Sequence, residues 1–523
     1  MKIWLFYFHF RYFCSLKSNS SILVLLFSDT TKIFLLRIFI GTLLILPVSA
    51  WAYDFTPDLQ KAYSEIFKLR IQAGKDLLAK ENPQNPFRVY VENYADMIEV
   101  LNSEDETAYE KLVSKEDQRL EAIEQTDRKS PYNRFLRAEI KLHWALLKIR
   151  FGHEIKAAWN VIQAYRLLEE NQKLFPHFLP NFKSMGCLHI LIGSIPENQQ
   201  WVSNFLGLKG NIQEGLKELE IASTDKVWGL EANFCLLFIQ AYILQYTDKA
   251  NTQLLHAVED HPDNLNLNFL ATAISLKTGR TDQAIQLLKK SPYNNSYLYF
   301  PVFELYKAEV NLYKSNYKQA TSAYLNYLKN FKGKTFVKDT YYKLFLCSWF
   351  EGDEKRGISY INKIPTAGST IAEADKAAQK FYENYARTNT LPNQALIKMR
   401  LAFDAGYYNE AREKAESLSE NSFSTTKDKA EFNYRVARIY HKMSDTAKAI
   451  QAYQKAIVLT DAHKDAQWHF GASAALQLGY IFQEQNQRLK ARTYFEKAIS
   501  YKKHEYKTSI DNKARAALTA MKF

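Results

Sequence analysis

Residues 433–457 read NYRVARIYHKMSDTAKAIQAYQKAI, and residues 474–499 repeat the same pattern as AALQLGYIFQEQNQRLKARTYFEKAI. Each stretch contains an amphipathic segment with helical spacing, a polar turn, and a second amphipathic segment with a small residue early in it. Five aligned positions agree in size, namely Ala437 with Gly479, Tyr440 with Phe482, Ala449 with Ala491, Tyr453 with Phe495, and Ala456 with Ala498. We therefore expect two copies of one helix–turn–helix unit.

These two units resemble the tetratricopeptide repeat (TPR), in which small residues lie where helices cross and aromatic residues fill the gaps between helices. The resemblance implies an all-α fold, a TPR-like α-solenoid of antiparallel helix pairs. Elsewhere in the chain we find no strand-like alternation of apolar and polar residues that lasts for more than a few residues.

The small residue of the second helix locates further copies of the unit. It falls, with spacings of 34, 36, 37, 54, 38 and 42 residues, at Ala250, Ala284, Ala320, Gly357, Ala411, Ala449 and Ala491. The longest step leaves room for one additional helix, which we expect over Ile371 to Arg387. Upstream, Ala157 fits the same pattern and Ala108 fits it poorly.

Length and composition favour an elongated array over one compact core. Among 523 residues only 17 are Gly and 13 are Pro, whereas Tyr and Phe each number 33. We expect an N-terminal extension and signal peptide at 1–52 and an N-terminal helical region with degenerate repeats at 53–222. A TPR-like solenoid with a C-terminal capping helix is expected at 223–523.

The N-terminal segment has the features of a secretory signal. Lys32 and Arg37 precede the apolar run Ile38 to Leu46, and Ala50-Trp51-Ala52 fits a cleavage site before Tyr53. These features predict an exported protein, periplasmic or secreted if the source is bacterial. The alternative is a membrane anchor formed by residues 33–52, which Arg37 and Pro47 would interrupt.

The stretch GSIPENQQWVSNFLGLKGNIQEGLKEL (193–219) is rich in glycine and could be taken for a ligand loop. Its glycines do not form a phosphate-binding pattern, and no strand precedes them. We interpret Gly207 and Gly210 as turn residues, Asn211 as a helix cap and Gly215 as the small residue of a repeat. A short helix is expected over Ile195 to Leu206, whose aromatic side chains pack on the preceding helix or, alternatively, line a groove for a partner.

The same stretch resembles the TPR family that includes the inclusion-body clearance proteins. The resemblance is loose over residues 130–500 and has a distinctive motif only over residues 186–219. It implies a non-enzymatic adaptor. The predicted signal peptide departs from these relatives and favours an exported bacterial member of the family.

No motif for catalysis, cofactor binding or metal binding is found in the sequence. His153 begins a segment like H-E-x-x-H, but Ala157 occupies the position of the second histidine. The cysteines that follow the signal segment, Cys187, Cys235 and Cys347, have no C-x-x-C spacing and are interpreted as buried structural residues. We expect no catalytic residue, no cofactor and no metal, and therefore no enzyme.

The candidate binding residues lie on the first helices of the repeats, which line the inner side of this kind of array. Tyr434, Arg438 and His441 form a stripe with helical spacing, opposite the packing stripe of the same helix. The matching positions in neighbouring repeats include Arg400, Phe403 and Tyr480. This pattern predicts a scaffold that binds protein partners. One alternative is a helical receptor of the cell envelope for a small ligand or glycan. The other is an ordinary solvent-exposed surface that binds nothing.

The C-terminal end is basic. After residue 52 the chain has 64 Lys and Arg against 55 Asp and Glu, a net charge of +9, and residues 490–523 contribute +6 of it. An apolar stripe in the last helix, from about Thr508, predicts a helix that caps the array. The charge predicts attraction to an acidic partner or an anionic surface, whereas no binding to nucleic acid is expected.

Overall fold

The computed structural model describes residues 53–195, 206–244, 246–463, 467–504 and 506–521. Within these ranges the chain consists of helices and connecting turns, and no β-strand occurs. The predicted all-α fold is confirmed. The signal segment, residues 33–52, lies outside the described residues.

The first half of the chain forms helices of very different lengths. Their bounds are α2 Pro57–Phe67, α3 Ile71–Leu78, α4 Pro86–Ser103, α5 Glu106–Leu112, α6 Lys115–Glu124, α7 Pro131–Arg150, α8 Glu154–Leu174, α9 Leu179–Gly193, α11 Ile212–Ala222, α12 Gly229–Tyr242, α13 Asp248–Asp260, α14 Leu265–Lys277 and α15 Thr281–Lys289.

The second half consists mostly of shorter, more uniform helices. Their bounds are α16 Val302–Tyr313, α17 Tyr317–Asn330, α18 Val337–Phe350, α19 Glu354–Ile361, α20 Glu373–Thr388, α21 Gln394–Asp404, α22 Tyr408–Glu416, α23 Thr426–Lys442, α24 Thr446–Asp461, α25 Phe470–Glu484, α26 Arg488–Ser500 and α27 Lys507–Ala520.

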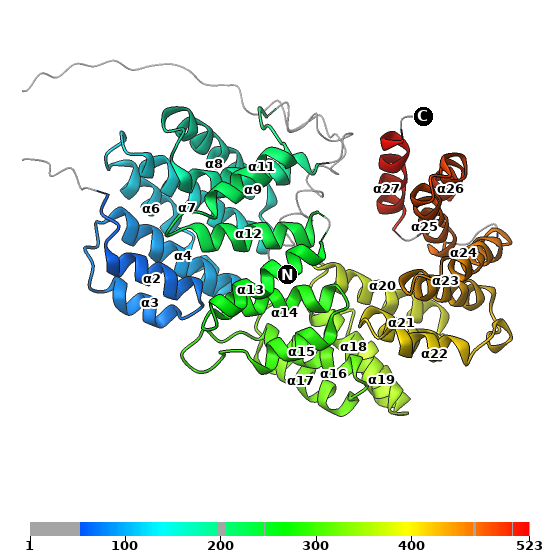
Figure 1. Cartoon of the computed structure of the whole chain (residues 1–523). Coiled ribbons are helices and arrows are strands. Elements are labelled where there is room, and N and C mark those ends of the chain that lie inside the picture. The colour runs from blue at the N-terminus through cyan, green and yellow to red at the C-terminus, as the bar shows by residue number, and fades with distance from the viewer. Residues whose placement is uncertain (1–52, 196–205, 245, 464–466, 505, 522–523) are drawn as a thin grey trace, which may run out of the picture.

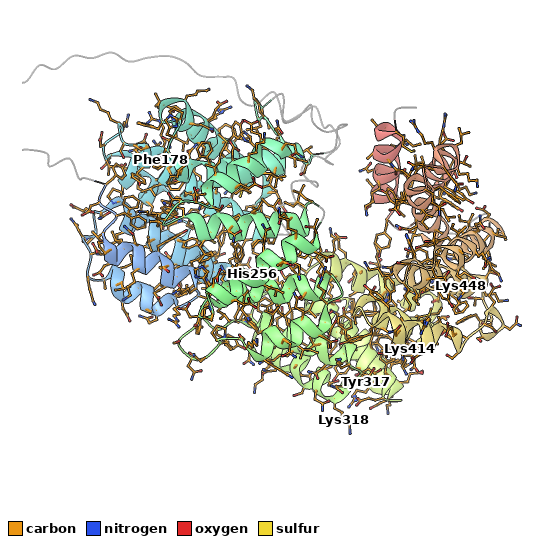
Figure 2. The ribbon with its side chains drawn as sticks, viewed as in Figure 1. Phe178, His256, Tyr317, Lys318, Lys414 and Lys448 are labelled. Atoms are coloured by element: carbon orange, nitrogen blue, oxygen red, sulfur yellow. The ribbon has the colours of Figure 1, made fainter. Side chains whose placement is uncertain are left out.

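Neighbouring helices pack as antiparallel pairs that follow one another along the array (Figure 1). The pairs include α7/α8, α9/α11, α14/α15, α16/α17, α18/α19, α21/α22, α23/α24 and α25/α26. Helix α20 stands between two pairs and packs on α18, which confirms the additional helix expected over Ile371 to Arg387. Exposed lysines of second helices follow the lower and right-hand edge of the view, as Lys318 on α17 and Lys448 on α24 show (Figure 2).

The small residues used to locate the repeats are buried where the helices of a pair cross. Each of them is at most 2% exposed, as measured at Ala157, Ala250, Ala284, Ala320, Ala411, Ala449 and Ala491. In the last pair the fit is tight, because a Cβ atom on Gly479 would lie 2.5 Å from ring carbons of Phe495. The spacing of small and aromatic residues therefore reports the packing of the pairs.

Residues 206–219 of the glycine-rich stretch lead into α11 and form most of it. Asn211 caps α11, since its side-chain oxygen accepts hydrogen bonds from the backbone N–H groups of Gln213 and Glu214. Gly207 has a φ of 71°, a conformation that glycine adopts without strain. The glycines therefore act as turn and packing residues, as predicted. The short helix expected over Ile195 to Leu206 lies almost wholly outside the described residues.

Two apolar clusters dominate the two ends of the chain. The first, which we call the N-terminal core, runs from Leu59 to Cys347 and is continuous across the 222/223 boundary. The second, the C-terminal core, runs from Ala437 to Met521 and includes the apolar stripe of α27. The division into 53–222 and 223–523 stays a prediction.

The last helix, α27, packs on α25 and α26. Its stripe of Ile510, Ala514, Ala517 and Met521 is buried, whereas Lys513 and Arg515 are exposed on its other side. The capping role expected for this helix stays a prediction. None of the helices among the described residues is long and apolar enough to cross a membrane.

Candidate functional site

The predicted binding residues lie on three successive first helices. Arg400 and Phe403 belong to α21, Tyr434, Arg438 and His441 to α23, and Tyr480 to α25. All six side chains are partly buried. Each is therefore held against a neighbouring helix while part of its surface remains accessible.

Arg438 forms the centre of the site because it contacts two of the predicted aromatic residues. Its guanidinium carbon lies 4.2 Å from the centroid of the Phe403 ring and 5.9 Å from that of Tyr434. Such contacts attract the cation to the face of the ring. The side chain of Arg438 is 34% exposed, and its nearest carboxylate oxygen, on Asp404, is 3.9 Å away. The guanidinium group thus keeps N–H donors for a ligand.

Arg400 lies deeper and joins two repeats. Its Nη2 donates a hydrogen bond of 3.1 Å to the hydroxyl of Tyr342 on α18. Burial disfavours its charge, but Tyr342 and Asp404 outweigh this effect and raise the pKa of Arg400 above its ordinary value. Arg400 therefore fixes α21 against α18 and sets the position of Phe403.

His441 and Tyr480 contact other partners than Arg438. The Nδ1 atom of His441 lies 3.4 Å from the hydroxyl of Tyr453, and burial lowers the pKa of His441. Tyr480 packs edge-on against Phe495, with ring centroids 5.2 Å apart. The structure thus groups Phe403, Tyr434 and Arg438, which we call the arginine cluster, while the roles of His441 and Tyr480 stay predictions.

Three residues near the arginine cluster were not predicted from the sequence. Glu431 and Arg435 form an ion pair one turn apart on α23, and Arg435 is buried. His469 meets Tyr434 edge-on, with ring centroids 5.7 Å apart, and burial lowers the pKa of His469 to about 4. The i, i+4 spacing of Glu431 and Arg435 is the signal that could have indicated the pair.

A buried ionic cluster lies in the N-terminal core, far along the chain from the predicted site. The Nζ atom of Lys183 is 2.6 Å from Glu139 and 2.7 Å from Glu231. Tyr63 donates a hydrogen bond to Glu231, and Ser184 donates one to Glu139. Burial opposes the charge of Lys183, but the two carboxylates raise its pKa well above the ordinary value. We call these residues the lysine cluster.

The thiols differ in burial, whereas the sequence predicted that all three are buried structural residues. Cys347 is buried, but Cys187 on α9 and Cys235 on α12 are partly buried and hydrogen-bonded to each other. This contact, together with burial, raises the pKa of Cys235 well above its ordinary value. Both cysteines are free thiols in the structure.

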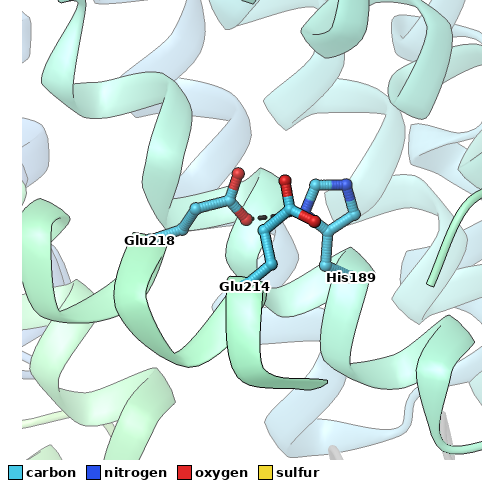
Figure 3. A group of neighbouring side chains, drawn as sticks. All are labelled: His189, Glu214 and Glu218. Carbon is cyan, nitrogen blue, oxygen red and sulfur yellow. Dashed lines mark hydrogen bonds and ion pairs between the residues drawn. The ribbon is translucent and has the colours of Figure 1, made fainter. Parts of the chain in front are cut away.

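Three side chains could hold a metal ion, although the sequence predicted no metal site. They are His189 on α9 and Glu214 and Glu218 on α11, with their ligand atoms close together (Figure 3). Sequence analysis missed them because the histidine and the two glutamates lie on different helices. Only the i, i+4 spacing of the glutamates is visible in the sequence.

One cavity is too small for an organic ligand. It lies between α4 and the loops around Phe300 and Phe336, and its volume is about 20 Å³. This is room for about one water molecule, whereas sites for small ligands measure about 300–1,000 Å³. This cavity therefore gives no support to a small-ligand receptor.

Comparisons with known proteins agree with the repeat architecture. The family model Iml2/Tetratricopeptide repeat protein 39 matches residues 181–380, and the Tetratricopeptide repeat model matches residues 430–462 and 472–505. The first range includes the 186–219 segment, and the others include the two units first found in the sequence. The search of the curated proteins finds no match.

The search of the solved structures finds alignments that span most of the chain at low sequence identity and low TM-score. The apo form of the quorum sensor NprR from B. thuringiensis is 12% identical with a TM-score of 0.27, and the match covers 77% of this chain and 97% of that one. The P58(IPK) TPR domain is 14% identical with a TM-score of 0.20, and the match covers 79% of this chain and 97% of that one. The APC/C hetero-tetramer Cut9-Hcn1 is 13% identical with a TM-score of 0.23, and the match covers 89% of this chain and 91% of that one.

Proposed function

The chain is a tetratricopeptide-repeat protein. We propose that it is a non-enzymatic scaffold that binds a protein partner through the arginine cluster. The observation that carries the proposal is the partly exposed guanidinium group of Arg438, held over the ring of Phe403 beside Tyr434. A group fixed in this way loses little further freedom when it binds.

The chemistry of the arginine cluster fits an extended, acidic peptide segment. A guanidinium group donates two parallel hydrogen bonds to a carboxylate, or single ones to backbone carbonyl groups. The adjacent rings of Phe403 and Tyr434 offer flat apolar surface beside this charge. Asp404 competes only weakly for Arg438, because the shortest distance between them is 3.9 Å.

Photo-crosslinking in the native cell tests this proposal. A photoreactive residue at Tyr434 should give discrete crosslinked protein bands. The control position is Val458 on α24, whose side chain is 64% exposed, and it should give none of these bands. Arg438→Ala should weaken the crosslinks at least severalfold, whereas Lys442→Ala removes an exposed cation from the same helix and should leave them unchanged.

Two outcomes would contradict the proposal. Equal crosslinking from Tyr434 and Val458 would show that the arginine cluster is not the binding surface. Crosslinks that are the same in Arg438→Ala and Lys442→Ala would show that Arg438 does not hold the partner.

We further propose that the scaffold is exported. The support is the apolar run Ile38 to Leu46, followed by the small residues Ala50 and Ala52. N-terminal sequencing of the cellular protein should then begin at Tyr53. Recovery of an intact chain that requires detergent would support the alternative, an anchor formed by residues 33–52.

The basic end is proposed to add a weaker contact with an acidic partner or an anionic surface. Lys497 is paired with Asp461 and Lys507 with Asp511, each at less than 3 Å. Lys502, Lys503 and Arg515 are exposed and have no ion-pair partner among the described residues. Unpaired cations of this kind attract anionic surfaces over about 10 Å at 0.1 M salt.

A further inference from the structure

Three side chains with metal-binding atoms converge between α9 and α11 (Figure 3). They are His189, which is buried, Glu218, which is also buried, and Glu214, which is exposed. One nitrogen or oxygen atom from each lies within 4.8 Å of the others. His189 belongs to α9 and the two glutamates belong to α11, well away from the arginine cluster in the chain.

The backbone holds the two helices close enough for this convergence. A Cβ atom on Gly215 would lie 2.5 Å from the carbonyl oxygen of Gly186, and one on Gly186 would lie 2.8 Å from that of Gly215. The absence of side chains at both positions therefore permits the close crossing of α9 and α11. One turn along each helix, this crossing places His189 opposite Glu218, and Glu214 lies on the same face of α11.

The carboxylate of Glu218 points to a ligand, because one of its buried oxygens lacks a partner. Its side chain is only 5% exposed, and its Oε2 atom lies 2.6 Å from Nδ1 of His189. Its other oxygen, Oε1, is buried and has no hydrogen-bond partner among the described residues. A buried carboxylate oxygen without a partner is costly, because burial removes the water that would solvate it.

Glu214 adds a second uncompensated charge. No hydrogen bond or ion pair to its carboxylate is found among the described residues. Two carboxylates four residues apart on a helix repel each other. A cation bound between Glu214 and Glu218 would remove this repulsion and supply the missing partner of Oε1.

We propose that His189, Glu214 and Glu218 bind a divalent transition-metal ion, with Zn²⁺ as the best fit. One imidazole nitrogen and two carboxylate oxygens suit Zn²⁺, whereas Ca²⁺ and Mg²⁺ prefer oxygen ligands alone. In a tetrahedral site with bonds of about 2.0–2.2 Å, the ligand atoms lie about 3.3–3.6 Å apart.

Only small movements separate the present arrangement from such a site. Oε1 of Glu218 becomes the ligand oxygen, and Nδ1 of His189 gives up its 2.6 Å contact with Oε2 for a bond to the ion. Glu214 must move inward, which its exposure allows. The fourth position then faces solvent beside Glu214 and is filled by water.

Metal binding changes the tautomer of His189. Nδ1 needs a free lone pair to reach the metal, so it gives up the hydrogen bond with Glu218, and the neutral imidazole carries its proton on Nε2. The ion then joins α9 to α11 at the crossing fixed by Gly186 and Gly215.

Zinc titration of the purified chain tests the proposal. The experiment is best done with Cys187 and Cys235 both changed to Ser, because these neighbouring thiols could also bind zinc. Isothermal titration with Zn²⁺ should show one site per chain. The melting temperature should rise with the zinc concentration.

Two matched glutamate variants locate the site. Glu214→Gln removes an exposed ligand without disturbing the core and should weaken zinc binding by about a hundredfold or more. Glu220→Gln makes the same change at an exposed position of the same helix, outside the group, and should bind zinc like its parent. His189→Gln should also abolish the rise in melting temperature.

The proposal is overturned if the chain with Cys187→Ser and Cys235→Ser binds no zinc at micromolar concentrations. It is also overturned if Glu214→Gln and Glu220→Gln bind zinc with equal affinity, which would place the metal elsewhere. Both results leave the arginine cluster untouched, since its test uses crosslinking and different variants.

Discussion

The N-terminal core and the C-terminal core are built from different side chains. The largest fully buried residues include Trp144, Trp228 and Tyr90 in the N-terminal core, which also surrounds the charges of the lysine cluster. In the C-terminal core alanine is the most frequent residue, and aromatic residues such as Tyr453 and Phe495 fill the remaining gaps.

The two cores also differ in the distance along the chain over which contacts form. In the C-terminal core each helix packs on its immediate neighbours, as α23, α24, α25 and α26 do in succession. In the N-terminal region Tyr63 bonds to Glu231, 168 residues away, and Arg150 bonds to Thr335, 185 residues away. A repeat array gains stability layer by layer, whereas the N-terminal core depends on distant segments meeting.

The largest loss of stability is expected from Lys183→Ala, which removes the cation of the lysine cluster in the N-terminal core. The change leaves Glu139 and Glu231 buried together without a cation, and breaking a buried ion pair costs about 3–5 kcal/mol. Chemical denaturation should show this loss. Lys217→Ala, at an exposed position of α11, should change stability little, and a small effect in both variants would mean that the lysine cluster contributes little.

A smaller effect is expected in the C-terminal core from Ala449→Leu or Ala491→Leu. Both alanines are fully buried, so a larger side chain should overpack the helix crossing and cost about 1–3 kcal/mol. Thermal melting measures the loss, with the exposed Ala447→Leu as control. If Ala449→Leu and Ala491→Leu melt like the native chain, the crossings are not tightly packed.

The pH dependence of stability distinguishes the cores further, through His143 in the N-terminal core. Asn93 accepts hydrogen bonds from Trp144 and Arg119 through Oδ1, so its Nδ2 donates to Nδ1 of His143. An imidazole that accepts a hydrogen bond at Nδ1 carries its proton on Nε2 and is neutral. Burial agrees with this state, since it lowers the pKa of His143 from 6.5 to about 3.

Because the folded pKa of His143 is depressed, the unfolded chain binds the extra proton between about pH 6.5 and 3. The stability from this group is complete above pH 6.5 and falls as the pH drops toward 3. Between pH 7 and pH 5 the native chain should lose about 1–2 kcal/mol more than His143→Gln, which cannot titrate there. Denaturation curves of both chains at the two pH values measure the difference, and equal losses would contradict a neutral buried His143.

The smallest effect on stability is expected from charge reversal at the basic end. Lys502→Glu combined with Lys503→Glu changes exposed, unpaired residues, so the free energy of unfolding should change by less than about 0.5 kcal/mol. Binding to anionic vesicles at low salt should nevertheless weaken. Adding Lys507→Glu breaks the ion pair with Asp511 and should cost a few tenths of a kcal/mol more. Vesicle binding that is unchanged in the double variant would leave α27 with its capping role alone.

The C-terminal half of the fold was predictable because its signals are local. Small residues such as Ala449 and Ala491 recur at steps that reflect one helix pair, and the long step correctly indicated α20. In the N-terminal half the same signal located α8, α11, α13 and α15, through Ala157, Gly215, Ala250 and Ala284. Helices α2 to α6 pack through large residues of irregular spacing, which no repeat pattern describes.

The candidate site was predictable in part for the same reason. The helical stripe placed Tyr434 and Arg438 on one face of α23, and the matching position in the preceding repeat supplied Phe403. That Arg400 bonds to Tyr342 of α18 could not be derived, because it depends on how successive repeats are inclined. The His189 group was missed because its ligands meet only when α9 crosses α11.

The capping helix α27 has a consequence for self-association. An uncapped repeat array ends in an apolar face, and such a face on one molecule could stack on the first repeat of another and propagate into a fibre. Here the buried stripe of α27 occupies that face, and its outward side carries Lys513 and Arg515. The apolar face that head-to-tail stacking would need is therefore already covered, and repulsion between two basic C-terminal ends opposes tail-to-tail pairing.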